Sequence, residues 1–173
     1  GNSYALSFKS SADLLKYVQE QDVQYVDFNF TDLRGKWQHL TLRVGYVDRD
    51  VLENGVYFDG SSIAGWRAIH ESDMVLIPDL VKVTYDPFSA QKTLKIFCDV
   101  RVPGSKESYN RDPRSIAKAA EQYLKKSSLG DTAFFGPELE FFVFDSVRVH
   151  TDMNHVSYQI DSAEGPYNSG RDY

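Results

Sequence analysis

The chain has 173 residues, of which 42% are hydrophobic and 25% charged, which is typical of a globular protein. Its 25 acidic residues outnumber its 19 Lys and Arg, and the net charge of −6 argues against a nucleic-acid partner, which requires a basic face. A single cysteine, no apolar run near the roughly 20 residues of a membrane span and no recognisable signal peptide favour a cytoplasmic protein with no membrane partner.

The first hundred residues carry the signals of one helix and several strands. Ser10 can cap a helix whose first turn holds Asp13. Val26 and Phe28 begin an alternation of apolar and polar residues that is typical of a half-buried strand. The expected elements are a helix over 11–20 and strands over 24–30, 36–44 and 93–100, with a turn at 31–35 and a short apolar run at 74–77.

Residues 55–73 show no periodicity. Glycine and serine crowd together here with Phe58, Trp66 and several charges. We interpret the stretch as a loop, and large aromatic residues in a loop indicate that it is pinned or functional.

The polar stretch 101–108 is a candidate domain boundary. Beyond it, Asp112 can cap a helix over 113–127, and Pro113 suits the first turn of that helix. The Phe-rich stretch 133–145 predicts a strand.

Two carboxylates, Glu138 and Glu140, stand two residues apart in this predicted strand. Side chains with that spacing share a face, about 6.5–7 Å apart. Divalent cations such as Mg²⁺ or Mn²⁺ are natural partners for such oxygens, and each Glu could serve a different ion of a two-metal site. Two solvated acids on an edge strand, or acids paired with Lys or Arg, would give the same spacing.

The remaining candidates are weaker on spacing alone. Asp59 lies in the Gly/Ser-rich loop, where an aspartate commonly bonds nearby backbone amides and makes a turn. His39, His70, His150 and His155 lack metal-ligand spacing, and we interpret them as structural or surface residues. The chain has no phosphate-binding P-loop motif and no G-x-S-x-G nucleophile motif.

Several longer motifs follow one another in a fixed order. Residues 25–36 contain YVDF and TDLRGK, 58–66 read FDGSSIAGW and 71–74 read ESDM. Residues 111–118 read RDPRSIAK and 135–142 read FGPELEFF. In this order the motifs resemble those of class I, bacterial-type glutamine synthetases, in the N-terminal part of that family.

The resemblance implies an α+β fold, with a β-grasp-like N-terminal domain over 1–104 and the first elements of the synthetase catalytic α/β domain over 105–173. It also implies a reaction in which ATP phosphorylates the γ-carboxylate of glutamate and ammonia displaces the phosphate to give glutamine. The family's other metal ligands, its substrate-binding arginines and its nucleotide pocket lie downstream, so we expect these residues alone to be inactive.

The family pattern also implies roles for single residues. Glu138 matches the metal ligand facing the nucleotide phosphates, and Glu140 matches a ligand of the glutamate-side metal. Asp59 matches the loop aspartate that reaches into a neighbouring subunit's site to bind and deprotonate ammonium, while Ser62 and Trp66 lie on the same loop. The partners implied are glutamate, ammonium, ATP and further synthetase subunits in a homo-oligomer, a dodecamer in this family.

Two other functions are compatible with these motifs. The chain could be a non-catalytic interaction module that binds synthetase subunits through the face of the Asp59 loop. It could also come from a γ-glutamyl-polyamine ligase, because those relatives share the motifs.

Overall fold

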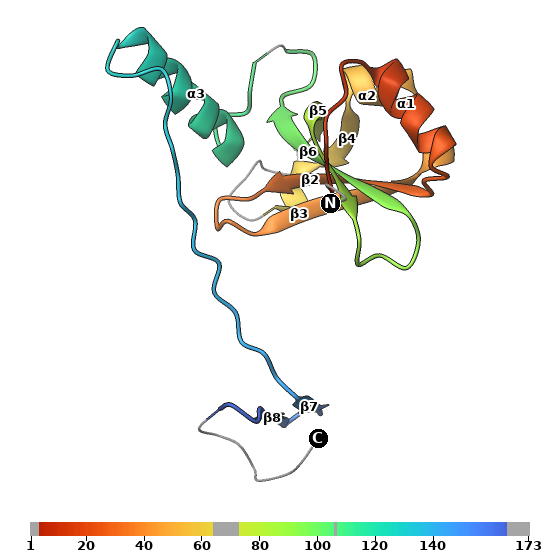
Figure 1. Ribbon diagram of the computed structural model, residues 1–173, viewed down its shortest axis with the longest axis vertical. Helices are drawn as coiled ribbons and strands as arrows, with labels where there is room; N and C mark the ends of the chain where they lie inside the picture. Colours follow the sequence, from red (N-terminus) through yellow and green to blue (C-terminus); the bar gives the residue numbers. More distant parts are fainter. Residues whose placement is uncertain (1–3, 64–72, 106, 166–173) are drawn as a thin grey trace. The chain divides into compact units, whose positions relative to one another are not determined.

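The computed structural model describes residues 4–63, 73–105 and 107–165. The chain divides into two compact units, Gly1–Ala133 and Phe134–Tyr173. The elements of the first unit (Figure 1) are β1 (Ala5–Leu6), α1 (Ser11–Glu20), β2 (Tyr25–Thr31), β3 (Trp37–Arg43), the 3₁₀ helix η1 (Val44–Tyr46), α2 (Arg49–Asn54), β4 (Val56–Asp59), the 3₁₀ helix η2 (Gly60–Ser62), β5 (Asp73–Asp86), β6 (Thr93–Arg101) and α3 (Pro113–Lys126).

A mixed sheet forms the first unit. Its strand order is β1-β5-β6-β2-β3, and β4 also pairs with β5. The central strands β2 and β6 are parallel, whereas the other pairs of this sheet are antiparallel. The α+β class expected from the sequence is therefore confirmed.

One face of the sheet is covered by α1 and α2 and contains the core (Figure 1). Leu14 of α1 and Leu52 of α2 are buried in one cluster with Val26 and Phe28 of β2. Successive side chains of a strand point to opposite faces, so Asp27 and Asn29, which alternate with these residues, lie on the second, polar face. Alternation in the sequence thus separates an apolar face from a polar one.

The helix and hairpin signals are confirmed at the level of single hydrogen bonds. The Ser10 hydroxyl accepts the Asp13 amide at 3.1 Å and caps α1. In the turn between β2 and β3, the carboxylate of Asp32 accepts the amides of Arg34 and Lys36, both at 2.9 Å. These bonds satisfy backbone donors that a tight turn leaves without ladder partners.

The first helix after the predicted boundary packs within the first unit through charged side chains. Arg114 and Lys118 of α3 form ion pairs with Asp99 of β6, and Arg114 also pairs with Asp79 of β5. Asp112 is fully buried and accepts the amides of Val100 and Arg114, so α3 begins directly on β6. The apolar residues Ile116 and Tyr123 on α3 remain exposed.

Part of the expected loop over 55–73 has regular structure, which corrects that interpretation. Residues 56–59 form β4, which pairs with the start of β5, and the helix α2 precedes it. The apolar run at 74–77 is the beginning of a strand that continues to Asp86. The loop assignment was wrong for residues 56–59 because this segment is too short to show an alternation of apolar and polar residues. It forms a strand because it pairs with β5.

The strand expected over 133–145 does not form. Residues 132–144 belong to no helix or strand, and the part of the second unit that the structure describes, up to residue 165, contains the antiparallel hairpin of β7 (Ser146–Thr151) and β8 (Val156–Asp161). A strand requires a neighbouring backbone to accept and donate its hydrogen bonds, and no strand in the described ranges pairs with 132–144. None of the helices described is long and apolar enough to cross a membrane.

Candidate functional site

Asp59 ends β4 and begins a tight turn. Along β4, Val56 and Phe58 are partly buried, whereas Tyr57 and Asp59 share the exposed face. The inward-facing ring of Phe58 lies 5.0 Å from the ring of Phe30 in the core. Phe58 therefore anchors β4 to the core, and the side chain of Asp59 lies on the exposed face of the strand.

Hydrogen bonds within the turn define how Asp59 leaves the strand. Its Oδ1 accepts the amide of Ser61 at 2.9 Å and caps η2. The hydroxyl of Ser62 donates to the carbonyl oxygen of Asp59 at 2.8 Å. Ile63, just beyond, is buried. Asp59 thus makes the local turn that its sequence context favours, and its carboxylate stays at the surface.

A second carboxylate lies opposite the first. Asp59 pairs in register with Asp73, the first residue of β5, and both are exposed. Side chains directly across an antiparallel ladder lie on the same face, about 4.5–5.5 Å apart at Cβ, and like charges there repel. The end of the β4–β5 pair that is connected through η2 therefore places two carboxylates on one exposed face.

The two glutamates lie in the other compact unit. Glu138 and Glu140 are exposed within residues 132–144, which form no strand. Nearby, the rings of Phe142 and Phe144 stack at 6.1 Å, so at least this pair, two residues apart, lies on one side of the chain. That Glu138 and Glu140 also share a face remains a prediction.

Carboxylate oxygens fit hard divalent cations such as Mg²⁺ and Mn²⁺. Among the residues that the structure describes, no group of three or more acidic, His or Cys side chains is placed to hold a metal ion. Glu138 and Glu140 therefore supply suitable donors but only part of a coordination shell, since Mg²⁺ demands near-octahedral geometry.

The structure joins only some of the predicted site residues. Asp59 and Ser62 share one turn and one hydrogen bond. Trp66 and His70 lie outside the described residues. Cys98 is buried in β6, and this burial raises the pKa of its thiol, which keeps it protonated and unreactive.

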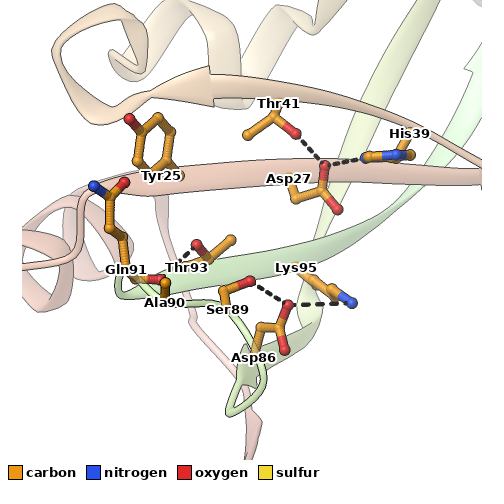
Figure 2. A pocket seen from close by; sticks show the side chains of 10 residues that line it. All are labelled: Tyr25, Asp27, His39, Thr41, Asp86, Ser89, Ala90, Gln91, Thr93 and Lys95. Atoms are coloured by element: carbon orange, nitrogen blue, oxygen red, sulfur yellow. Dashed lines mark hydrogen bonds and ion pairs between the residues drawn. The ribbon is translucent and has the colours of Figure 1, made fainter.

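An open hollow of about 430 Å³ lies on the polar face of the sheet (Figure 2). Asp27 lies on one side of the hollow. Its Oδ1 accepts a hydrogen bond from the hydroxyl of Thr41 and contacts Nδ1 of His39, both at 2.7 Å. Asp86 dominates the other side and interacts with Ser89 and Lys95.

The carboxylates of the hollow are engaged by their own neighbours. Hydrogen bonds from the Ser89 hydroxyl and the Phe88 amide lower the pKa of Asp86. The remaining oxygen of Asp27 accepts the side-chain amide of Asn29 at 3.2 Å. His39 thus contacts a neighbouring side chain within the fold, in keeping with its interpretation as a structural or surface residue, and both carboxylates of the hollow are hydrogen-bonded by neighbouring side chains.

Sequence reasoning missed α2 and the glycine that ends it. Asp48 caps this helix by accepting the amide of Val51 at 2.9 Å, and Gly55 follows its last residue with φ +94°. A capping aspartate followed seven residues later by glycine is a recognisable helix start and stop. That signal, applied to 48–55, would have located both α2 and the start of β4.

A mixed sheet with helices packed against one face, as seen here, is the architecture of a β-grasp domain. Comparison with known families agrees. The model described as glutamine synthetase, beta-Grasp domain, matches residues 22–103, and that of the glutamine synthetase catalytic domain matches residues 110–173.

A curated relative and a solved structure that resemble this chain are both named glutamine synthetase, and a second relative carries a different name. A protein named glutamine synthetase from Azospirillum brasilense is 56% identical over 156 residues, which cover 90% of this chain and 33% of that protein. A protein named 3-hydroxylaminophenol mutase from Cupriavidus pinatubonensis is 51% identical, covering 95% of this chain and 35% of that protein. A cryoEM structure of Plasmodium falciparum glutamine synthetase has a TM-score of 0.71 and 26% identity, covering 90% of this chain and 30% of that chain.

The chain belongs to the glutamine synthetase family. It spans about a third of the length of the curated relatives it matches and corresponds to their N-terminal third.

Proposed function

We propose that these residues act as the N-terminal part of an ATP-dependent glutamate–ammonia ligase. In that reaction ATP transfers its γ-phosphoryl group to the γ-carboxylate of glutamate, and ADP leaves. Ammonia then attacks the acyl phosphate, phosphate leaves and glutamine forms. The observation that carries the proposal is the match of two glutamine synthetase domain models, in order, to residues 22–103 and 110–173.

In this proposal the turn at the end of β4 serves the second step. Ammonium must bind and lose a proton before it can attack, and an exposed carboxylate can do both. Asp59 is exposed and lies opposite Asp73, so two negative charges converge where a cation would approach. The site completed by Asp59 would belong to a neighbouring subunit of a homo-oligomer in the cytoplasm.

Glu138 and Glu140 would hold divalent cations in the first step. Mg²⁺ or Mn²⁺ bound there would neutralise phosphoryl charge and align the transferred group. The exposed glutamates keep their oxygens accessible, and further ligands would have to join them, because the described residues contain no cluster of three or more candidate ligands.

The 173 residues alone should not make glutamine. Phosphoryl transfer depends on positioning and charge stabilisation, and the motifs of the chain include no phosphate-binding loop. We expect no phosphate or glutamine when the purified chain is incubated with glutamate, ATP, Mg²⁺ and ammonium. Turnover that follows the 173-residue species, verified by intact mass, would contradict this part of the proposal.

A chimera tests the proposal itself. These residues replace the matching N-terminal third of the Azospirillum brasilense relative, and glutamine formation is measured. We expect an active chimera in which Asp59→Ala raises KM for ammonium by tenfold or more, while KM for ATP changes little. Glu138→Ala and Glu140→Ala should instead lower kcat and increase the Mn²⁺ concentration needed for half-maximal rate.

The alternatives give different outcomes in the same experiment. A polyamine ligase would use putrescine in place of ammonium. A non-catalytic module would yield an inactive chimera that still assembles into an oligomer. Mixing Asp59→Ala with Glu138→Ala subunits should restore activity if one site is shared between subunits, because a mixed interface can pair an intact turn with intact metal ligands.

A further inference from the structure

Helix α3 is assigned differently by the family comparison and by the structure. The two domain models meet between residues 103 and 110, so α3 falls within the match to the catalytic domain. The compact units instead divide after Ala133, so α3 falls in the same unit as the β-grasp sheet. The contacts between α3 and the sheet explain why the structure differs from the order of the domains in the sequence.

Apolar packing does not hold α3 on the sheet. No residue of this helix is buried, and none belongs to the core cluster or to the apolar residues packed against it. Ile116 and Tyr123 are 55% and 69% exposed. A helix of this length is only marginally stable in water without tertiary contacts. The attachment of α3 therefore depends on its polar and charged contacts.

Four charged side chains join α3 to β5 and β6. Arg114 pairs with Asp79 of β5, and its Nε lies 3.4 Å from Oδ1 of Asp99 in β6. One helical turn further on, Nζ of Lys118 lies 2.5 Å from the other oxygen of Asp99. The side chains of Asp79, Asp99 and Arg114 are each less than a quarter exposed, so water and salt screen these pairs less than they screen surface pairs. We call these four residues the ion-pair cluster.

The backbone in front of α3 is also bonded to β6. The amide of Tyr109 donates to the carbonyl oxygen of Val100 at 2.9 Å, and the amide of Val100 donates to Oδ2 of Asp112 at 3.0 Å. The hydroxyl of Ser115 donates to the same carboxylate oxygen at 2.9 Å. The polar stretch 101–108 therefore lies between two segments that are bonded to each other, which restricts its use as a joint between domains.

We propose that the ion-pair cluster is an ionic latch that holds α3, the first helix of the catalytic-domain match, on the β-grasp sheet. The latch moves the joint of the chain, the segment about which the two compact units can reorient, from 101–108 to 127–133. The β-grasp domain and α3 then move as one body, although the family models assign them to different domains. The inference does not depend on the proposed ligase activity.

The same helix offers a matched control. Lys125 pairs with Glu121 at 2.9 Å, and both side chains are more than half exposed. Lys118→Ala and Lys125→Ala remove the same group from the same helix, but only Lys118→Ala removes a contact with the sheet. A difference between these two variants therefore reports the latch and not the helix propensity of alanine.

Amide hydrogen exchange of the 173-residue chain tests the latch. Lys118→Ala and Arg114→Ala should speed exchange over residues 116–126 about fivefold or more, because α3 loses its hold on the sheet. Lys125→Ala should change that exchange less than about twofold. Lys118→Arg, which keeps the positive charge, should retain the slow exchange. Amides of β2 should exchange at the same rate in all these variants.

Asp79→Asn provides an independent test, because Asp79 lies on the sheet and cannot alter the helix propensity of α3. Asparagine retains a side-chain oxygen for the amide of Val81, which Asp79 accepts at 3.2 Å, but it removes the charge that pairs with Arg114. This variant should also speed exchange in α3. If Asp79→Asn and Lys118→Ala leave α3 exchange at the level of Lys125→Ala, the latch inference is wrong. Equal acceleration in β2 and α3 would show a loss of global stability and would also overturn it.

Limited proteolysis locates the joint. Chymotrypsin should cut the unaltered chain after α3, and in Lys118→Ala it should also cut at Tyr123, which is exposed on α3. Cleavage of the unaltered chain at Tyr109 before any cleavage beyond α3 would place the joint at the predicted boundary and contradict the inference.

Discussion

Strand β2 and the stretch 134–144 are built from similar residues but lie in opposite environments. Both are rich in phenylalanine and both contain acids. Phe28 in β2 is fully buried between β3 and β6, whereas Phe142 is 80% exposed in a stretch that pairs with no described strand. The difference shows that strong strand-forming residues form a strand only when the rest of the fold supplies neighbouring backbones.

The comparison predicts a very large difference in protease sensitivity. Chymotrypsin should cut the exposed stretch around Phe134 and Phe141 several orders of magnitude faster than it cuts at Phe28, because cleavage in the core requires global unfolding. Mass spectrometry over a digestion series should show a resistant product ending between residues 134 and 144. Simultaneous loss of both regions would contradict the division into a folded unit and an unpaired stretch.

Replacing one phenylalanine by alanine in each region should change the free energy of unfolding of the first unit by very different amounts. Phe28→Ala should lower the free energy of unfolding of the first unit by about 3–5 kcal/mol, because it leaves a cavity among buried side chains. Phe142→Ala should change it by less than about 0.5 kcal/mol. Urea unfolding followed by tryptophan fluorescence, to which Trp37 contributes through its packing against Phe97 in this unit, measures both changes in the free energy of unfolding.

Two aspartates that cap helices, one buried and one exposed, allow the effect of burial to be compared for the same residue type. Asp112→Ala should destabilise the first unit by about 2–3 kcal/mol, because it leaves the buried amide of Val100 unsatisfied as well as uncapping α3. Asp48→Ala removes an exposed cap of α2 and should cost about 1 kcal/mol. If Asp112→Ala and Asp48→Ala lowered the free energy of unfolding equally in the same urea assay, the hydrogen bond from Asp112 to β6 would add no stability beyond that of a helix cap.

The smallest effect concerns pH. The Ser89 hydroxyl and the Phe88 amide hold the pKa of Asp86 below its ordinary value of 3.8. The carboxylate therefore contributes stability that is present above that ordinary value and is lost as the pH falls through the lowered pKa. Ser89→Ala should cost about 1 kcal/mol or less near neutral pH, and its deficit should shrink when urea unfolding is repeated towards pH 2.5. A deficit independent of pH would contradict the assignment.

Local patterns in the sequence determined much of this protein. The Ser10 and Asp112 caps predicted α1 and α3, and alternation predicted β2, β3 and β6, because both signals arise from hydrogen bonds and side-chain directions within a few residues. The ordered motifs also identified the family, and they singled out Asp59, Glu138 and Glu140, whose roles remain predictions.

Only the tertiary structure decided what depends on distant neighbours. Residues 56–59 form a strand because β5 lies beside them, and residues 133–145 do not because no described strand pairs with them. The close contact of Gly55 with Leu76, and the pairing of Asp59 with Asp73, join positions that no local period connects. Strand pairing and close packing are contacts between segments far apart in the chain, so a pattern read along one segment cannot contain them.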